Sequence, residues 1–434
     1  NCLKISEDPK LIEALINLLH RANKNKEALA WAKKLISSQQ GQDTEQIMLL
    51  ARAYFLCDDL TNYILTLRRF SEASLWKGVS TQSIAEGMII ECGLENNIES
   101  KLKDIIKISP ADPNVNLNLA REKLRKFDFQ NGWRHYSHRV NLPNPQLHFN
   151  QRPDWDGCRL IDKNILLIGE QGIGDVSYFS RFLQPLCESN QNIYMLCEQR
   201  MQSFLQSNYP KIYFFSDPSY INFLPKPLVK VAIGSLPLLY GNDKELIYEL
   251  GKKNPLKPKQ ADQNIWFQRL RNDSGGLPII GISLQGGRPG DEFQQKKRNL
   301  PMKKILKILE GKEICLVNLQ HSRNQPSNNV SSIANQLGLK LLEYKGLTHD
   351  ISQLIAVMAC LDGLVTAQQT NAHLAGALGL RGLVALPVVA HFVFGNSDLT
   401  PWYPSLQLVR SEEFGKWDTC IDSLREKIDN WLLV

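Results

Sequence analysis

The chain of 434 residues is 43% hydrophobic and 22% charged, a composition typical of a soluble globular protein with about two to four domains. Its formal net charge of +7 is too small and too evenly spread for a dedicated nucleic-acid-binding protein, and it favours anionic ligands only mildly. No apolar stretch approaches the roughly 20 residues that span a membrane, and the N-terminus lacks the pattern of a signal peptide.

The nine cysteines are scattered without a CxxC pair, and their odd number argues against a disulfide framework or a zinc site. We therefore expect reduced thiols and a cytoplasmic location. The chain opens with "NCLKISEDPKL" and has no initiator methionine, as a piece of a longer protein would.

Residues 1–142 are predicted to form an all-helical region of tetratricopeptide-like repeats. Four segments combine a short polar or glycine turn with helical periodicity and recur about every 32 to 36 residues, which is the tetratricopeptide period. They begin at Ala22 ("ANKNKEALAWAKKLI"), Cys57 ("CDDLTNYILTLRRFS"), Gly93 ("GLENNIESKLKDIIKI") and Lys126 ("KFDFQNGWRHYSHRV"). The alternative is a non-repetitive helical bundle. If the helices form a solenoid, its surface suits a peptide or protein.

A proline-spotted connector, residues 143–158, ends the helical region, and strands alternating with helices follow in two series. In residues 159–262 the expected strands are "NILLIGE", "NIYMLCE", "KIYFFSD" and "VKVAIGS", with helices beginning near Ser177 and Met201. In residues 263–434, after a lysine-rich junction, they are "LPIIGISLQ", "EICLVNLQ", "KLLEYKG", "GLVTAQQ" and "GLVALPV". Helices are expected at about 301–310, 328–337, 351–360 and 371–379, with a closing helix at the end.

The predicted fold class is therefore α/β, with an all-helical N-terminal region followed by two Rossmann-like halves. Ligands in such sheets bind beyond the carboxyl ends of the strands, so the place where the two halves meet is the favoured site.

The stretch "GEQGIGDVSYF" joins a glycine turn after a strand to an acid at the start of a helix. Backbone amides at Gly172 and Gly174 are candidates for holding a phosphate. Asp175 has two interpretations. As a helix cap it would stabilise the fold by about 1 kcal/mol; as a general base it would take a proton from an acceptor hydroxyl. Spacing alone favours the cap.

In "VTAQQTNAHLAGALG" four polar residues precede a helix of small residues, and amides at a helix N-terminus can bind a phosphate or diphosphate. The polar residues are Gln368, Gln369, Thr370 and Asn371, and the helix carries His373. The alternatives are an ordinary polar loop for the glutamines and a satisfied capping role for the histidine.

In "SLQGGRPGDEFQQKKRNLP" a strand ends at Gln285, a glycine-rich loop carries Arg288, and a basic cluster with Lys297 and Arg298 precedes a helix. These cations would neutralise a diphosphate, and Arg288 and Lys297 are candidates for contacting its phosphates. The alternative is a cluster of solvated surface charges.

These motifs resemble a family. "WDG" at Trp155, "ILLIGEQGIGDVSYFSRF" from Ile165, "THDISQLIAVMACLDGLVTAQQTNAHLAGALG" from Thr348 and "PWYPSLQLVR" from Pro401 look like bacterial tetratricopeptide-repeat proteins with a glycosyltransferase-like C-terminal half. That half is similar to the heptosyltransferases of glycosyltransferase family 9 and, more remotely, to protein O-GlcNAc transferases. The resemblance implies a GT-B fold.

Carried over residue by residue, the resemblance implies that Asp175 is the general base and that the second half binds a nucleotide sugar as substrate, with no metal and no cofactor. Its donor-site candidates are Gln285, Arg298, Gln320, Gln368, Gln369, Thr370, Asn371 and His373. One departure stands out: relatives have an aspartate before the "HLA" helix, where this chain has Gln368-Gln369, and this changes the contacts to the donor.

The sequence thus predicts a cytoplasmic, metal-independent glycosyltransferase, inverting by resemblance, that moves a sugar from a nucleotide-diphosphate donor to an acceptor hydroxyl. The helical repeats point to a protein acceptor. One alternative is an inactive transferase-like scaffold that serves as a protein-binding module. The other is an enzyme acting on a glycan or a lipid-linked sugar.

Overall fold

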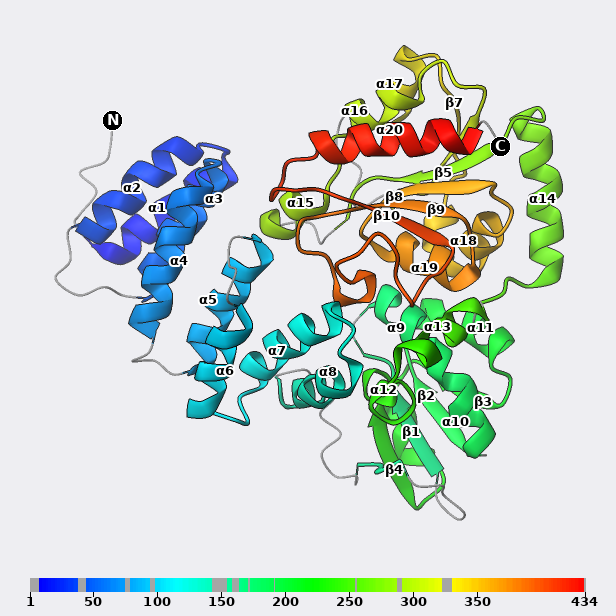
Figure 1. The fold of residues 1–434 in the computed structure, drawn as a ribbon, viewed down its shortest axis with the longest axis horizontal. Coiled ribbons are helices and arrows are strands. Elements are labelled where there is room, and N and C mark those ends of the chain that lie inside the picture. Colours follow the sequence, from blue (N-terminus) through cyan, green and yellow to red (C-terminus); the bar gives the residue numbers. More distant parts are fainter. Residues whose placement is uncertain are drawn as a thin grey trace. The chain divides into compact units, whose positions relative to one another are not determined.

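The computed structural model describes residues 8–37, 44–74, 79–93, 98–142, 154–157, 164–170, 172–190, 192–253, 256–286, 291–321 and 330–432 (Figure 1). The chain forms two compact units, Asn1–Leu119 and Ala120–Val434.

The first unit is all-helical in its described residues. Its helices are α1 (Pro9–Arg21), α2 (Asn25–Ser37), α3 (Thr44–Leu56), α4 (Leu60–Ser74), α5 (Val79–Glu91), α6 (Ile98–Ile108) and the first half of α7 (Pro113–Arg125). Consecutive helices pack against one another from α1 to α6. Ile12 and Ile16 of α1 meet Ala28, Ala32 and Leu35 of α2 in one core, because apolar residues three or four positions apart share a helix face.

A left-handed turn recurs between the two helices of each pair. Asn23, Asp58, Gly93 and Phe127 all have positive φ angles, at spacings of 35, 35 and 34 residues. In each case the residue's N–H donates to the carbonyl three positions earlier, at 2.9 to 3.1 Å. A left-handed backbone is costly for residues other than glycine, so its return at a fixed spacing indicates a true structural repeat. The tetratricopeptide assignment itself stays a prediction.

The first sheet of the second unit has the strand order β3-β2-β1-β4, all parallel. Its strands are β1 (Asn164–Ile168), β2 (Ile193–Leu196), β3 (Ile212–Phe215) and β4 (Leu228–Ala232). Between and after them lie α9 (Ile173–Phe179), η2 (Ser180–Phe182), α10 (Leu183–Ser189), α11 (Gln199–Asn208), η3 (Pro218–Phe223), η4 (Ile233–Ser235), α12 (Leu236–Tyr240) and α13 (Lys244–Lys252). Strand β1 is buried at every position, as expected for a central parallel strand.

The second sheet has the order β10-β9-β8-β5-β6-β7 and is also parallel. Its strands are β5 (Ile279–Ser283), β6 (Cys315–Asn318), β7 (Lys340–Leu342), β8 (Gly363–Ala367), β9 (Gly382–Leu386) and β10 (Leu406–Arg410). The helical segments are α14 (Gln260–Ser274), α15 (Glu292–Arg298), α16 (Met302–Leu309), α17 (Val330–Gln336), η6 (Leu347–His349), α18 (Ile351–Met358), α19 (Thr370–Leu378), η7 (Phe392–Phe394) and α20 (Asp418–Leu432).

The predicted fold class is confirmed: a helical N-terminal region precedes two Rossmann-like halves (Figure 1). Three details differ from the prediction. Helix α14 occupies part of the expected lysine-rich junction, strand β10 was not predicted, and the basic cluster before α16 lies within a helix of its own, α15. Of α14, only Trp266, Leu270 and Ser274 are buried, so its sequence lacks a clear apolar stripe.

Helix α8 (Phe129–Tyr136) follows the last left-handed turn but belongs to the second unit. Its Trp133 is 1% exposed and lies within 6.3 Å, ring centre to ring centre, of Phe179 in the first half and of Phe392 and Trp402 in the second. The indole N–H donates to the carbonyl of Gly241 at 2.7 Å. The helical elements thus continue to η1 (Ser137–Asn141), whereas the compact helical unit ends at Leu119.

We expect Trp133→Ala to lower the free energy of unfolding of the second unit by about 3 to 5 kcal/mol, because it opens a cavity where three segments meet. Phe223→Ala is the control: Phe223 is 82% exposed, so its removal should change stability by less than about 0.5 kcal/mol. Urea unfolding followed by circular dichroism measures both. Equal losses in the two variants would contradict a central role for Trp133.

Candidate functional site

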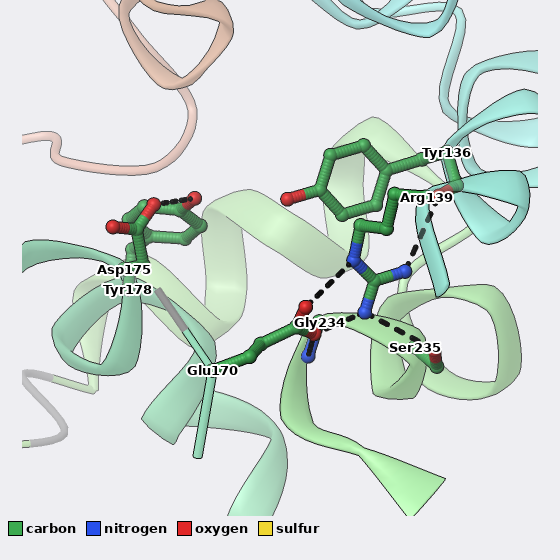
Figure 2. Close-up of polar contacts among 7 residues, drawn as sticks. All are labelled: Tyr136, Arg139, Glu170, Asp175, Tyr178, Gly234 and Ser235. Atoms are coloured by element: carbon green, nitrogen blue, oxygen red, sulfur yellow. Dashed lines mark hydrogen bonds and ion pairs between the residues drawn. The ribbon is translucent and has the colours of Figure 1, made fainter. Parts of the chain in front are cut away.

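Asp175 lies in the first turn of α9, directly beyond the carboxyl end of β1. Its Oδ2 accepts a hydrogen bond from the backbone N–H of Gly172 at 3.1 Å. Its Oδ1 accepts one from the hydroxyl of Tyr178 at 2.7 Å (Figure 2). Gly172 is the N-cap residue of α9, and Asp175, the third residue of the helix, caps it by accepting the backbone N–H of Gly172. Both predicted interpretations remain open, because a carboxylate has about four lone-pair sites and these two bonds take one each.

The pKa of Asp175 is raised above its ordinary value. Burial is the main cause; the bonds from Tyr178 and Gly172 oppose it, and the negative charge of Glu170 adds to it. A carboxylate with a raised pKa binds a proton more readily than a solvated one does. The environment of Asp175 therefore strengthens it as a base.

Helices α9 and α19 bring the two halves together. They pack side by side, and a Cβ added at Gly174 would lie 3.0 Å from Cδ2 of His373. Gly174 thus lies within the first turn of α9, where its missing side chain makes room for His373. On α19, a Cβ at Gly376 would lie 2.2 Å from the ring of Tyr403, so this small residue accommodates an aromatic ring.

His373 is the fourth residue of α19 and does not cap the helix. Its Nδ1 lies 3.1 Å from the hydroxyl of Tyr403. Burial lowers the pKa of His373 to about 3, and the positive charges of Arg298 and Arg181 contribute. The pKa of His391, whose ring is 5.9 Å away, also falls well below its usual range, with burial again the main cause. Both histidines are therefore neutral near pH 7.

The predicted donor-site residues converge where β5, β6 and β8 end. Asn371 donates to the Ser283 hydroxyl at 3.0 Å and to the Leu319 carbonyl at 2.9 Å. Gln369 donates to the Ser283 carbonyl at 2.9 Å. The side-chain oxygen of Gln320 accepts from the backbone N–H of Gln285 at 2.9 Å, and its amide donates to the carbonyl of the same residue at 2.9 Å. These amides hold the three strand ends in register.

Gln368 and Thr370 complete this group. Gln368 is 2% exposed, and its side-chain oxygen accepts from the backbone N–H of His391 at 2.8 Å. Thr370 begins α19 and is half-buried, while the N-cap residue Gln369 makes no side-chain capping bond. The first amides of α19 are therefore not occupied by a capping side chain, and a donor-binding role for these residues stays a prediction.

The basic cluster was predicted to lie between a loop and a helix, but Lys297 and Arg298 form the last turn of α15. Lys297 is buried, which makes it a poor fit to an open phosphate loop. The positive charge of Arg298 lowers the pKa of both His373 and His391, and its role in binding the donor stays a prediction. Arg288 lies outside the described residues.

Sequence reasoning missed three residues around Asp175. Tyr178 binds its carboxylate. Glu170, the acid directly after β1, pairs with Arg139 of η1 and was visible in "GEQG" as a charge at the end of a buried strand. Arg181 is 2% exposed and donates to the carbonyls of Tyr178 and Trp402, each at 2.9 Å, so it bridges the two halves. No sequence pattern marked Arg181 as buried.

Among the described residues, no group of three or more His, Cys, Asp or Glu side chains could hold a metal ion. No described helix has both the length and the apolar character needed to cross a membrane.

No model of a known protein family matches the chain. Over 308 residues it is 23% identical to protein FlbA of Caulobacter vibrioides, an alignment that covers 66% of this chain and 50% of FlbA. The chain therefore spans about half the length of this curated relative.

Among solved structures, the chain is similar to ADP-heptose lps heptosyltransferase II of E. coli, with 12% identity over 62% of this chain and 98% of that one and a TM-score of 0.41. It is also similar to a family 9 glycosyl transferase of Veillonella parvula, with 12% identity over 63% of this chain and 98% of that one and a TM-score of 0.44. A third similar structure is an O-GlcNAc transferase of Thermobaculum terrenum, with 12% identity over 100% of this chain and 94% of that one and a TM-score of 0.28.

We expect stability to fall between pH 7 and pH 5 in part because of His373. Its folded pKa of about 3 lies below the ordinary value of about 6.5, so as the pH falls the unfolded chain takes up a proton that the folded chain refuses. At pH 5 the loss amounts to about 2 kcal/mol for this residue.

Urea unfolding at pH 7.5 and pH 5.0 tests this. His373→Asn should make the difference between the two pH values about 2 kcal/mol smaller. Phe223→Ala, which changes an exposed side chain without an ionisable group, is the control and should leave the difference unchanged. An unchanged difference in the His373 variant would show that this ring does not resist protonation.

Proposed function

We propose that the chain is a glycosyltransferase that moves a sugar from a nucleotide-diphosphate donor to an acceptor hydroxyl. The observation that carries the proposal is the meeting of a half-buried carboxylate of raised pKa with the start of a helix from the other half. Asp175 belongs to α9 of the first half, and α19 of the second half packs beside it. The sequence motifs that resemble heptosyltransferases contain these same two helix starts.

In the proposed reaction Asp175 takes the proton of the acceptor hydroxyl, and the acceptor oxygen forms a bond to the anomeric carbon. The bond from that carbon to the diphosphate oxygen breaks, and the nucleoside diphosphate leaves with the electron pair. The first amides of α19 and the charge of Arg298 would stabilise the leaving group without a metal ion. The resemblance favours inversion at the anomeric carbon.

The first test separates donor binding from turnover. Thermal unfolding is measured with UDP, GDP, ADP, CDP, dTDP and CMP, each at millimolar concentration. A ligand at about 100 times its dissociation constant should stabilise the native state by roughly 2.7 kcal/mol. We expect one nucleotide to stabilise the wild type and Asp175→Asn alike, while the variant loses about 10²- to 10⁴-fold in turnover of the matching nucleotide sugar.

Asp350→Asn is the matched control, because Asp350 caps α18 by accepting from the amides of Ser352 and Gln353. It should keep most of its stability, because asparagine caps a helix about as well as aspartate does, and it should keep its turnover. Full turnover in Asp175→Asn would remove Asp175 as the base. No stabilisation by any nucleotide would favour the alternative, an inactive scaffold. The presence of Gln368-Gln369, where the resembling family has an aspartate, also favours that alternative.

We further propose a cytoplasmic enzyme with a protein acceptor held by the helical unit, since arrays of helix pairs present surfaces suited to peptides. Removing residues 1–111 tests this. The remaining chain begins at Asp112, whose side chain caps α7 through the amides of Asn114 and Val115, and it keeps α8 with Trp133. We expect it to unfold cooperatively and to bind the nucleotide but to lose transfer to protein.

Undiminished transfer to protein by this shortened chain would contradict a role of the helical unit in acceptor binding. Mass spectrometry of proteins from the native host identifies the acceptor. Modified glycans or lipid-linked sugars without modified proteins would favour the second alternative.

A further inference from the structure

A buried ion pair joins η1, at the end of the helical region, to Glu170, which lies five residues before Asp175. Arg139 of η1 is 4% exposed and Glu170, two residues after β1, is 1% exposed. The Arg139 Nε donates to Glu170 Oε2 at 3.0 Å, and its Nη2 pairs with Oε1 (Figure 2). This contact has the two-pronged geometry of the strongest arginine–carboxylate pairs.

Both partners are further held from two other elements. Glu170 Oε1 accepts from the backbone N–H of Gly234 at 2.9 Å, while Arg139 donates to the Ser235 hydroxyl and to the Tyr136 carbonyl, each at 3.2 Å. The Arg139 guanidinium also lies 4.4 Å from the centre of the Tyr136 ring. A Cβ at Gly234 would come within 2.6 Å of Glu170 Oε1, so a larger residue at this position would push against the ion pair.

Stability alone gives little reason for such a pair. Taking two charges out of water is costly, and well-packed apolar residues often replace a buried pair without loss. Position gives a better reason. Glu170 and Asp175 lie at the two ends of one short segment, and Figure 2 shows the hydroxyl of Tyr136 pointing from α8 toward the side where Asp175 and Tyr178 lie.

We propose that Arg139 is a positioning residue for glycosyl transfer: by holding Glu170, five residues before Asp175, it fixes where Asp175 is presented to the acceptor. The inference rests on the function proposed above. The end of the helical region then takes part in transfer, because η1 supplies Arg139 and α8 supplies the Tyr136 ring that lies against it.

The test uses the full chain and compares Arg139→Met with the double variant Arg139→Met/Glu170→Met. Stability is measured by urea unfolding. Turnover is measured as release of nucleoside diphosphate with water as acceptor. The donor is a nucleotide sugar that carries the nucleotide found to stabilise the protein most.

The single variant leaves a buried carboxylate unpaired and should be strongly destabilised, whereas the double variant should recover most of the stability. Its turnover should nevertheless stay about 10- to 100-fold below wild type at saturating donor, with KM for the donor unchanged, because a small displacement of a base has an effect of this size. Turnover that recovers together with stability would overturn the proposal.

The matched control is the other buried acid–arginine pair near by in sequence, Glu122 with Arg125 on α7. Glu122→Met/Arg125→Met should behave like the double variant in unfolding and like wild type in turnover. Glu170→Gln adds a second readout. The charge of Glu170 raises the pKa of Asp175, so its removal should shift the acid limb of the pH–rate profile to lower pH. An unmoved limb would leave Glu170 with a structural role only.

Two further measurements keep this inference separable from the proposed function. Loss of turnover in Asp175→Asn together with normal turnover in the Arg139/Glu170 double variant would overturn the positioning role alone. If the wild type shows no turnover, hydrogen exchange decides: we expect amides of residues 172–179 to exchange about tenfold faster in the double variant and those of β1 to stay protected. Unchanged exchange at residues 172–179 would overturn the positioning role.

Discussion

The arrangement of the second unit depends on the contacts of the buried Trp133 indole. It touches aromatic rings from both Rossmann-like halves and donates its N–H to the carbonyl of Gly241. Because aromatic rings bury much surface and prefer edge-to-face contacts, one residue can fix the position of three segments at once. Helix α8 therefore acts as a shared core element of both halves, although its sequence continues the pattern of the helix pairs before it.

The second half builds its part of the site from neutral groups. The side-chain amides of Gln320 and Asn371 bond to backbone groups beyond the strand ends, and that of Gln368 bonds to the backbone N–H of His391. Burial keeps His373 and His391 uncharged. A carboxylate at the 2%-exposed Gln368 would be a desolvated charge in need of a partner, whereas the amide accepts the His391 N–H at no such cost. Gln368 and Gln369, where the resembling family has an aspartate, thus leave the described residues of this part of the second half without a buried negative charge.

Much of the fold could be predicted from the sequence because parallel strands and helix pairs have strong periodic signals. The nine predicted strands formed, and the turn at Asn23 recurred at the predicted spacing. Strand β10 escaped prediction because its pairing with β9 gives it its form, and α14 escaped because it buries few residues. The site was predictable where a motif brought residues together along the chain. The partners of Asp175 and Glu170 were predictable only in part, since Arg139 lies 31 residues from Glu170 and only the folded chain pairs them.

In Asp175 the helix cap and the general base are not mutually exclusive interpretations. Capping uses one lone pair of Oδ2 and the Tyr178 hydroxyl uses one of Oδ1, so the carboxylate is oriented at both oxygens and can still accept a proton. Those two bonds stabilise the charged form and would by themselves weaken the base. Burial and the neighbouring charge of Glu170 act in the opposite direction and prevail, because the pKa is raised. A carboxylate that is rigid because it caps, and basic because it is buried, combines the orientation and the proton affinity that removal of a hydroxyl proton requires.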